Sequence, residues 1–151
     1  PDDARFAGRC NMPLVIQDYC RETGQVVPEG AAEILRLVTD SLAMKIRFVL
    51  ERLEEVIGYR IEVLHIIGGG GQNDQLNKSI ASSINRPVVV GPYEATAAGN
   101  VMMQKVALDG LRSLGEGRDL IRESFQTRHF EPAHPDDWDT AYVRFRNLMN
   151  L

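Results

Sequence analysis

The chain has 151 residues, of which 44% are apolar and 25% are charged, and its 17 basic and 21 acidic side chains leave a net charge of −4. These proportions are those of a globular domain with room for a hydrophobic core, so intrinsic disorder and low complexity are excluded. A membrane-spanning helix is excluded as well, because no apolar run approaches about 18 residues. The mild acidic balance, without a Lys/Arg block, argues against nucleic acid as a partner.

The first residues and the cysteines indicate the cellular setting. The chain starts with polar residues rather than with a charged and then apolar signal segment, which predicts a piece cut from a longer protein. Cys10 and Cys20 form no C-x-x-C pair, so we expect reduced thiols and a cytoplasmic protein. No zinc site is expected, because ligand-like neighbours are missing around the three histidines, His65, His129 and His134.

A long helix is the strongest periodic signal in the chain. Residues 1–30 predict an irregular segment with one short helix, and Pro28 punctuates its end. Apolar residues then recur every three or four positions, as one face of a helix requires: Leu35, Val38, Leu42, Ile46, Val49, Leu53 and Val56. This pattern predicts an amphipathic helix over 31–57 that covers the core with this face and ends at Gly58.

Two strand-like segments follow, with four glycines after the first. Residues 61–67 end in a nearly apolar run, which suits a strand covered on both faces. Apolar residues at every fourth position behind glycines 68–71 predict a helix over 73–85. A second strand is expected at 87–90, because Pro87 occupies the first position, where proline is tolerated.

Three helices complete the chain. The first, over 94–108, begins with small residues at 95–99 that would let a neighbour approach closely, and it ends at Asp109-Gly110. Ser113 and Glu116 form a capping-box signature for the second, which reaches about residue 125.

A loop and a last helix make up residues 127–151. The loop contains Pro132 and Pro135, and Asp136 or Asp137 is expected to cap the helix. Its apolar stripe comprises Trp138, Ala141, Tyr142, Phe145 and Leu148.

The order of elements predicts an α/β fold with parallel strands joined by a right-handed crossover. Two strands make a poor sheet, so several further strands are expected upstream of this chain. Without them, the edge of the 61–67 strand would expose unpaired backbone groups. We therefore expect this chain alone to self-associate or to pair with the rest of its parent.

The glycine run indicates a ligand. Each ordered glycine costs about 0.5 to 1 kcal/mol of conformational entropy relative to alanine, and a tight turn needs only one or two. The surplus favours contact between backbone and ligand, and the following helix turns its positive end toward the same place, which suits a nucleotide or another phosphate. A flexible connector is the alternative.

Neither of the two best-known phosphate-binding motifs fits the run. A P-loop would need glycine directly before Lys78-Ser79, and that position is Asn77. A dinucleotide fingerprint would need a third glycine at Asn73 or Asp74. The run therefore belongs to another nucleotide architecture or to none.

Two blocks in this order, GGGGQN at 68–73 and GPYEATAAGN at 91–100, resemble the C-terminal nucleotide domain of FGGY-type carbohydrate kinases. Further sequence segments, at 1–6, 12–13, 19–25 and 41–45, are most similar to family members that phosphorylate L-rhamnulose. The similarity covers the chain to about Ala107, and the last 40 residues or so match loosely. One departure lies in the site, because the family usually has Ser where this chain has Gly71, which offers no hydroxyl contact.

The resemblance implies an actin-like (ribonuclease H-like) ATPase fold. Residues 1–151 would be the C-terminal portion of the second, ATP-binding domain of a two-domain sugar kinase. The kinase would transfer the γ-phosphate of ATP to a sugar hydroxyl, with Mg²⁺ as cofactor. The general base, the magnesium ligands and most of the sugar site would lie upstream, so no catalytic or metal-ligating residue is assigned here and this chain alone is expected to be inactive.

The resemblance also implies roles for the glycine run. Gly68, Gly69 and Gly70 would pack against the phosphate and ribose of ATP or ADP, with Gly71 completing the run. Gln72 and Asn73 would lie near adenine, whose edge needs both donor and acceptor.

Four residues in or near the two blocks have structural interpretations. Asn73 fits an ordinary helix N-cap as well as an adenine contact. Glu94 and Asn100 are expected to cap and brace the helix behind the site, and Asp74 to complement the helix dipole.

Three alternatives remain open at this point. The kinase could act on another ketose. The chain could instead be another α/β nucleotide- or coenzyme-binding module. Finally, it could be a non-enzymatic α/β interaction domain.

Overall fold

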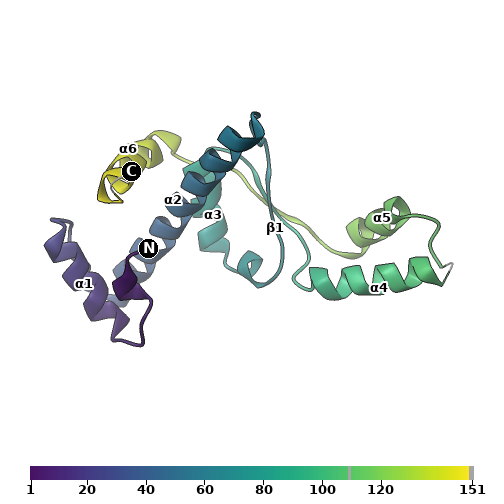
Figure 1. The fold of residues 1–151 in the computed structure, drawn as a ribbon, viewed down its shortest axis with the longest axis horizontal. Coiled ribbons are helices and arrows are strands. Elements are labelled where there is room, and N and C mark those ends of the chain that lie inside the picture. Colours follow the sequence, from purple (N-terminus) through teal and green to yellow (C-terminus); the bar gives the residue numbers. More distant parts are fainter. Residues whose placement is uncertain (109, 150–151) are drawn as a thin grey trace.

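A computed structural model of the chain describes residues 1–108 and 110–149 and contains a small sheet and several helices (Figure 1). Asp109, expected to help end a helix, lies outside the described residues, as do the last two residues of the predicted C-terminal helix region. In chain order the elements are η1 Ala4–Phe6, α1 Met12–Glu22, α2 Ala31–Ile57, β1 Leu64–Ile66, η2 Gly69–Gln72, α3 Asp74–Ile84, β2 Val88–Val90, α4 Ala95–Ala107, α5 Leu114–Ser124, β3 Arg128–Phe130 and α6 Pro135–Leu148. Within the described residues, no helix has the length and apolar character needed to cross a membrane.

The long helix α2 has the predicted bounds but buries a different face. Gly58 adopts a left-handed conformation with φ of 77°, and its N–H donates to the Glu54 carbonyl at 2.8 Å, which ends the helix. The buried residues are Ala43 and Leu50, with Ile46 partly buried between them. The predicted apolar face is wrong except at Ile46, because its other members are exposed: Leu35, Val38, Leu42, Val49, Leu53 and Val56.

The sheet has three strands and is mixed. β1 pairs with β2 in parallel, and β2 pairs with β3 antiparallel. The prediction of two parallel strands is therefore incomplete, because β3 lies in the segment expected to be loop. Its three residues are too short for an alternating pattern to stand out beside the nearby prolines.

β1 is shorter and less covered than predicted. It spans three residues rather than the seven of 61–67, and within the described part of the chain it forms one edge of the sheet. Its central residue, His65, is exposed, so the expectation of a strand covered on both faces is wrong for this structure.

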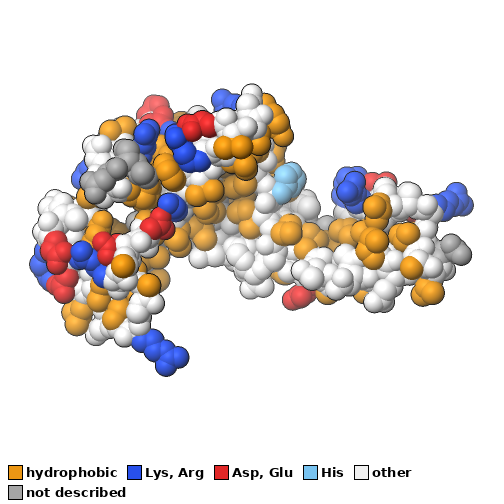
Figure 2. All heavy atoms as spheres, viewed as in Figure 1, with side chains coloured by type: hydrophobic (Ala, Val, Ile, Leu, Met, Phe, Trp, Pro, Cys, Tyr) orange, Lys and Arg blue, Asp and Glu red, His pale blue; other side chains and the backbone are white. Residues whose placement is uncertain are grey.

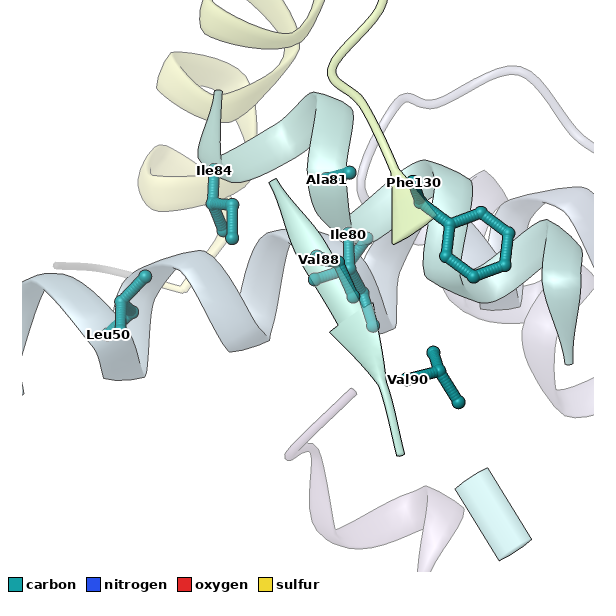
Figure 3. Packing of buried hydrophobic residues seen from close by; sticks show 8 residues of the cluster. Leu50, Ile80, Ala81, Ile84, Val88, Val90 and Phe130 are labelled. Atoms are coloured by element: carbon teal, nitrogen blue, oxygen red, sulfur yellow. The ribbon is translucent and has the colours of Figure 1, made fainter. Parts of the chain in front are cut away.

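The core is formed by residues of α2, α3 and the sheet, and α3 contacts both α2 and the strands β2 and β3. Figure 3 shows Ile80 of α3 next to Val88 of β2. Small serines let α3 sit close to its neighbours, and Ser79 donates from its hydroxyl to Asp40 of α2 at 3.1 Å. The predicted helix over 73–85 is confirmed, and it is the central element of the fold.

Helices α4 and α5 pack on each other and extend away from the rest of the molecule (Figure 1). Gly117 allows this contact, because a Cβ there would meet the Met102 sulfur. The capping box is confirmed in part: Ser113 accepts from the Glu116 N–H at 3.2 Å, while the Glu116 carboxylate accepts from the Arg112 N–H instead of from that of Ser113. Of the small residues that open α4, Gly99 is not required by a close neighbour, since a Cβ there would meet nothing within 4 Å.

Helix α6 docks on α2 through polar contacts around Arg47. The guanidinium of Arg47 in α2 donates to Asp139 of α6 at 2.6 Å. The Tyr142 hydroxyl of α6 donates to Glu51 of α2, also at 2.6 Å. The expected aspartate cap is wrong, because His134 is the N-cap, with φ of 50° and without a side-chain cap hydrogen bond. Pro135 begins the helix, so Asp136 and Asp137 fall inside its first turn.

Candidate functional site

The glycine run lies at the end of β1, beside the turn that follows β2. The Gly91 N–H donates to the Ile66 carbonyl at 2.8 Å, and the Gly68 N–H donates to the Pro92 carbonyl at 3.2 Å. These bonds extend the parallel pairing past the strands and hold the two turns together. The two sequence blocks at 68–73 and 91–100 are therefore neighbours in space.

The four glycines have different reasons to be glycine. Gly68 has φ of 79°, a conformation that other residues rarely adopt. Gly71 is buried, and a Cβ there would lie 2.5 Å from Cγ1 of Val90. Gly69 and Gly70 are exposed, have no positive φ, and would place a Cβ in open space. The fold therefore requires two of the glycines, and its own packing does not account for the other two.

The run folds as a short 3-10 turn. The Gly71 N–H donates to Gly68 and the Asn73 N–H to Gly70, at 3.1 and 3.5 Å. Among the described residues, no acceptor is found for the N–H groups of Gly69 and Gly70. Gly69 and Gly70 thus combine open space at Cβ with backbone N–H groups that are available to a ligand.

The residues opening α3 already interact with the chain. The Asn73 side-chain oxygen accepts from the Leu76 N–H at 3.0 Å, so the N-cap interpretation is confirmed. Asp74 lies in the first turn, and its carboxylate also forms an ion pair with Arg128. Gln72 is exposed next to them. The positive end of α3 is thus partly compensated by the chain's own oxygens.

Two residues that support the run were missed by the sequence analysis. Asn77 is fully buried, and its side-chain N–H₂ donates to the Gly71 carbonyl at 2.9 Å. Arg128 of β3 donates to the same carbonyl. A polar residue among the apolar positions of a buried helix is a usable signal for Asn77, whereas Arg128 comes from a strand 57 residues later in the chain.

The expected supports in α4 are wrong. Glu94 occupies the N-cap position of α4 but makes no side-chain cap hydrogen bond. Asn100 is exposed on the helix.

No metal-binding group is found in the described part of the chain, where no three His, Cys, Asp or Glu side chains gather. Both cysteines are free thiols, with Cys10 exposed and Cys20 buried.

Comparisons with known proteins define the class to which this arrangement belongs. Residues 1–108 match the sequence model described as the FGGY family of carbohydrate kinases, C-terminal domain. The chain therefore belongs to the FGGY family of carbohydrate kinases, which removes the two alternatives outside that family.

Curated relatives agree with this assignment. The chain is 44% identical over 149 residues to a protein named rhamnulokinase from Bacteroides thetaiotaomicron, covering 99% of this chain and 31% of the relative. It is 38% identical over 135 residues to a rhamnulokinase from Bacillus subtilis, covering 89% of this chain and 28% of the relative. The chain thus spans about a third of these relatives, and the first match also reaches the last 40 residues, which were expected to match loosely.

A solved structure supports the fold. The crystal structure of xylulose kinase from Rhodospirillum rubrum superposes with a TM-score of 0.65 at 18% identity, covering 84% of this chain and 26% of that chain. This match confirms the predicted α/β, actin-like fold. At such low identity it carries no information on the sugar.

Proposed function

We propose that the full-length protein is an ATP-dependent sugar kinase in which residues 68–73 contact the nucleotide. The observation that carries this proposal is the pair of open glycines, Gly69 and Gly70, whose presence the packing of the chain does not require. Family membership supplies the reaction class, because the matched family is one of carbohydrate kinases. Magnesium would accompany ATP, with ligands from segments outside this chain.

Within this proposal the residues of the run have the roles that the family resemblance implies. Gly68, Gly69 and Gly70 present backbone to the phosphate and ribose, and a side chain at the two open positions would occupy ligand space. Gln72 and the free amide N–H₂ of Asn73 face the adenine. Gly71 serves the fold rather than the ligand, since it packs against Val90.

The proposed acceptor is L-rhamnulose. The support is the naming of the curated relatives at 36–44% identity as rhamnulokinases. The test is a panel of L-rhamnulose, xylulose, fuculose and glycerol assayed with full-length enzyme and ATP. A tenfold preference for another acceptor, equivalent to about 1.4 kcal/mol in transition-state binding, would replace this substrate.

The nucleotide contact is tested by Gly69→Val in the full-length protein. The new side chain should raise the apparent ATP dissociation constant by about tenfold or more, because it fills space that the ligand needs. Gly8→Val is the matched control, since Gly8 is also exposed and open but lies far along the sequence from the run. A folded Gly69→Val protein with unchanged ATP affinity would show that the nucleotide binds elsewhere.

A further inference from the structure

The partly exposed side chain of Arg128 contacts three separate parts of the candidate site. One guanidinium nitrogen donates to the Gly71 carbonyl, and another donates to the Asp74 carboxylate. The guanidinium carbon also lies 5.6 Å from the ring centroid of Tyr93, within the range of a cation–π interaction. One side chain thus contacts the glycine run, the start of α3 and the turn after β2.

The Gly71 carbonyl is the focus of these contacts. It accepts from Arg128 of β3 and also from Asn77 of α3, at 2.9 Å for the Asn77 amide nitrogen. Glycine peptides have more conformational freedom than any others, so a run of four needs external ties to keep one shape. Two donors from different elements fix the orientation of the last peptide of the run.

Strand register places Arg128 at this point. β3 pairs antiparallel with β2 so that Arg128 lies opposite Val90. Val90 is the residue against which Gly71 packs. The guanidinium therefore reaches the glycine run from the last paired position of β2, directly before the turn that carries Tyr93.

We propose that Arg128 is a positioning residue for nucleotide binding, which holds the glycine run in its binding shape through the Gly71 carbonyl and Asp74. This inference rests on the proposed function. Arginine suits the task because its planar fork donates to two acceptors at once, whereas a lysine ammonium is a single point charge on a flexible stem.

The main test compares Arg128→Gln with wild type in the full-length protein. Titration with a fluorescent ATP analogue and steady-state kinetics should show an ATP dissociation constant and KM raised by about tenfold, the effect of losing one charge-assisted hydrogen bond. The KM for the sugar and kcat should change by less than about threefold, because Arg128 is not placed at the reacting atoms. Arg128→Lys should fall between wild type and Arg128→Gln.

Arg122→Gln is the matched control. Arg122 also pairs with an aspartate, Asp119, but both are exposed on α5. Its removal takes away the same charge and should leave ATP binding unchanged. A structural defect alone would lower the amount of active enzyme, and hence kcat, without selectively raising the KM for ATP.

A second variant keeps the proposal testable if Arg128→Gln does not fold. Asp74→Asn removes one partner of the guanidinium at a position more than half exposed. It should weaken nucleotide binding, and combined with Arg128→Gln it should add little, because the two act through one contact. If Arg128 instead bound phosphate directly, freeing it from Asp74 would leave affinity equal or higher, and the proposal would be overturned.

Hydrogen exchange separates this proposal from the proposed function. In Arg128→Gln, the peptide covering residues 68–76 should exchange faster without any nucleotide, while the core of α3 stays protected. If wild type binds no ATP, the proposed function fails. If wild type binds ATP and Gly69→Val weakens it but neither Arg128→Gln nor Asp74→Asn does, only the role of Arg128 is wrong.

Discussion

Gly70 and Gly71 are adjacent in sequence, yet a side chain would meet opposite surroundings at the two positions. A Cβ at Gly71 would overlap Cγ1 of Val90, while a Cβ at Gly70 would meet nothing within 4 Å. Gly71 is required by the fold, and Gly70 is available to a ligand. Glycine content alone does not separate these two requirements.

Replacing Gly71 with Ala in the full-length protein should lower the free energy of unfolding by about 1–3 kcal/mol, the usual cost of overpacking. Gly70→Ala should change it by about 1 kcal/mol at most, since its backbone conformation accepts alanine. Thermal unfolding midpoints of the two variants measure the contrast.

Val90→Ala provides the control for this overlap. It removes the methyl group that a Cβ at Gly71 would meet, so the double variant should be less destabilised than the sum of the single variants. Full additivity would mean that Gly71 does not owe its identity to Val90.

At the candidate site, the sequence predicted those residues that can be recognised from their neighbours in the chain. The glycine run and the Asn73 cap follow from neighbouring positions, and the cap is confirmed by the bond from the Leu76 N–H. Arg128 could not be predicted in the same way, because its contacts depend on the register between β2 and β3. Asn77 lies between the two cases, since its burial was readable but its acceptor was not.

One carboxylate near the end of α2 joins this helix to the segment before β1 and to Arg86, two residues after the end of α3. Glu54 accepts from both terminal nitrogens of Arg86, at 2.5 and 3.0 Å, and from the Ile61 N–H at 2.5 Å. The hydrogen bond from Arg86, and then that from Ile61, lowers the pKa of Glu54 below its usual value of 4.5. The carboxylate form thus stabilises the folded state.

This contribution should depend on pH. A group whose pKa is lowered by folding stabilises the protein above its unfolded pKa and loses that contribution as the pH falls through the folded value, because the unfolded state takes up the proton first. The thermal unfolding temperature of wild type should therefore decrease as the pH is lowered through and below 4.5, the ordinary pKa of a glutamate carboxyl. Midpoints measured from pH 7 down to about pH 3 record the slope.

Glu54→Gln should start from a lower midpoint and show a shallower fall with acid. Glu55→Gln is the matched control, because Glu55 is the next residue and its pair with Arg52 is exposed at the surface. Equal acid slopes for wild type and Glu54→Gln would contradict a role for this carboxylate.

Among the elements, prediction succeeded where end signals are strong. Gly58 ended α2 as expected, and Asn73 began α3. The buried face of α2 was missed because the contact with α3 uses small Ala43, which carries little weight in a hydrophobic pattern. The cap of α6 was missed because Pro135 begins the helix one residue before the aspartates.

At the scale of the molecule, the chain exposes more surface than a protein of its size usually does. Its accessible area is 10070 Å², against roughly 7,700 Å² for a typical folded monomer of this mass. Figure 2 shows apolar side chains exposed over both the α1–α2–α6 part and the α4–α5 part. The helix α2 alone exposes Leu35, Leu42, Val49 and Val56 at seven-residue intervals.

Residues 1–151 expressed alone should therefore self-associate. The exposed face of α2 and the open edge of β1 both offer surface that another copy can cover. Light scattering at low micromolar concentration, with a mass spectrum to identify the chain, measures the assembly. A stable monomer would show that neither surface is sufficient.

The double variant Leu42→Lys/Val49→Lys distinguishes the two surfaces. It places charges on the exposed face of α2 without touching the buried Ala43 and Leu50. A shift toward monomer identifies the helix face as the contact. Unchanged association would indicate that the copies meet through the open edge of β1.

The contact between Arg128 and Gly71 also has a consequence for the order of events during synthesis. The two residues are 57 positions apart, and ribosomes add about 5–20 residues per second, so about 3–11 s pass between the appearance of one and that of the other. During this interval β3 does not yet exist, and of the two donors to the Gly71 carbonyl only Asn77 has been made. The hydrogen bond from Arg128 to the Gly71 carbonyl can therefore form only after the residues of α4 and α5 have been made.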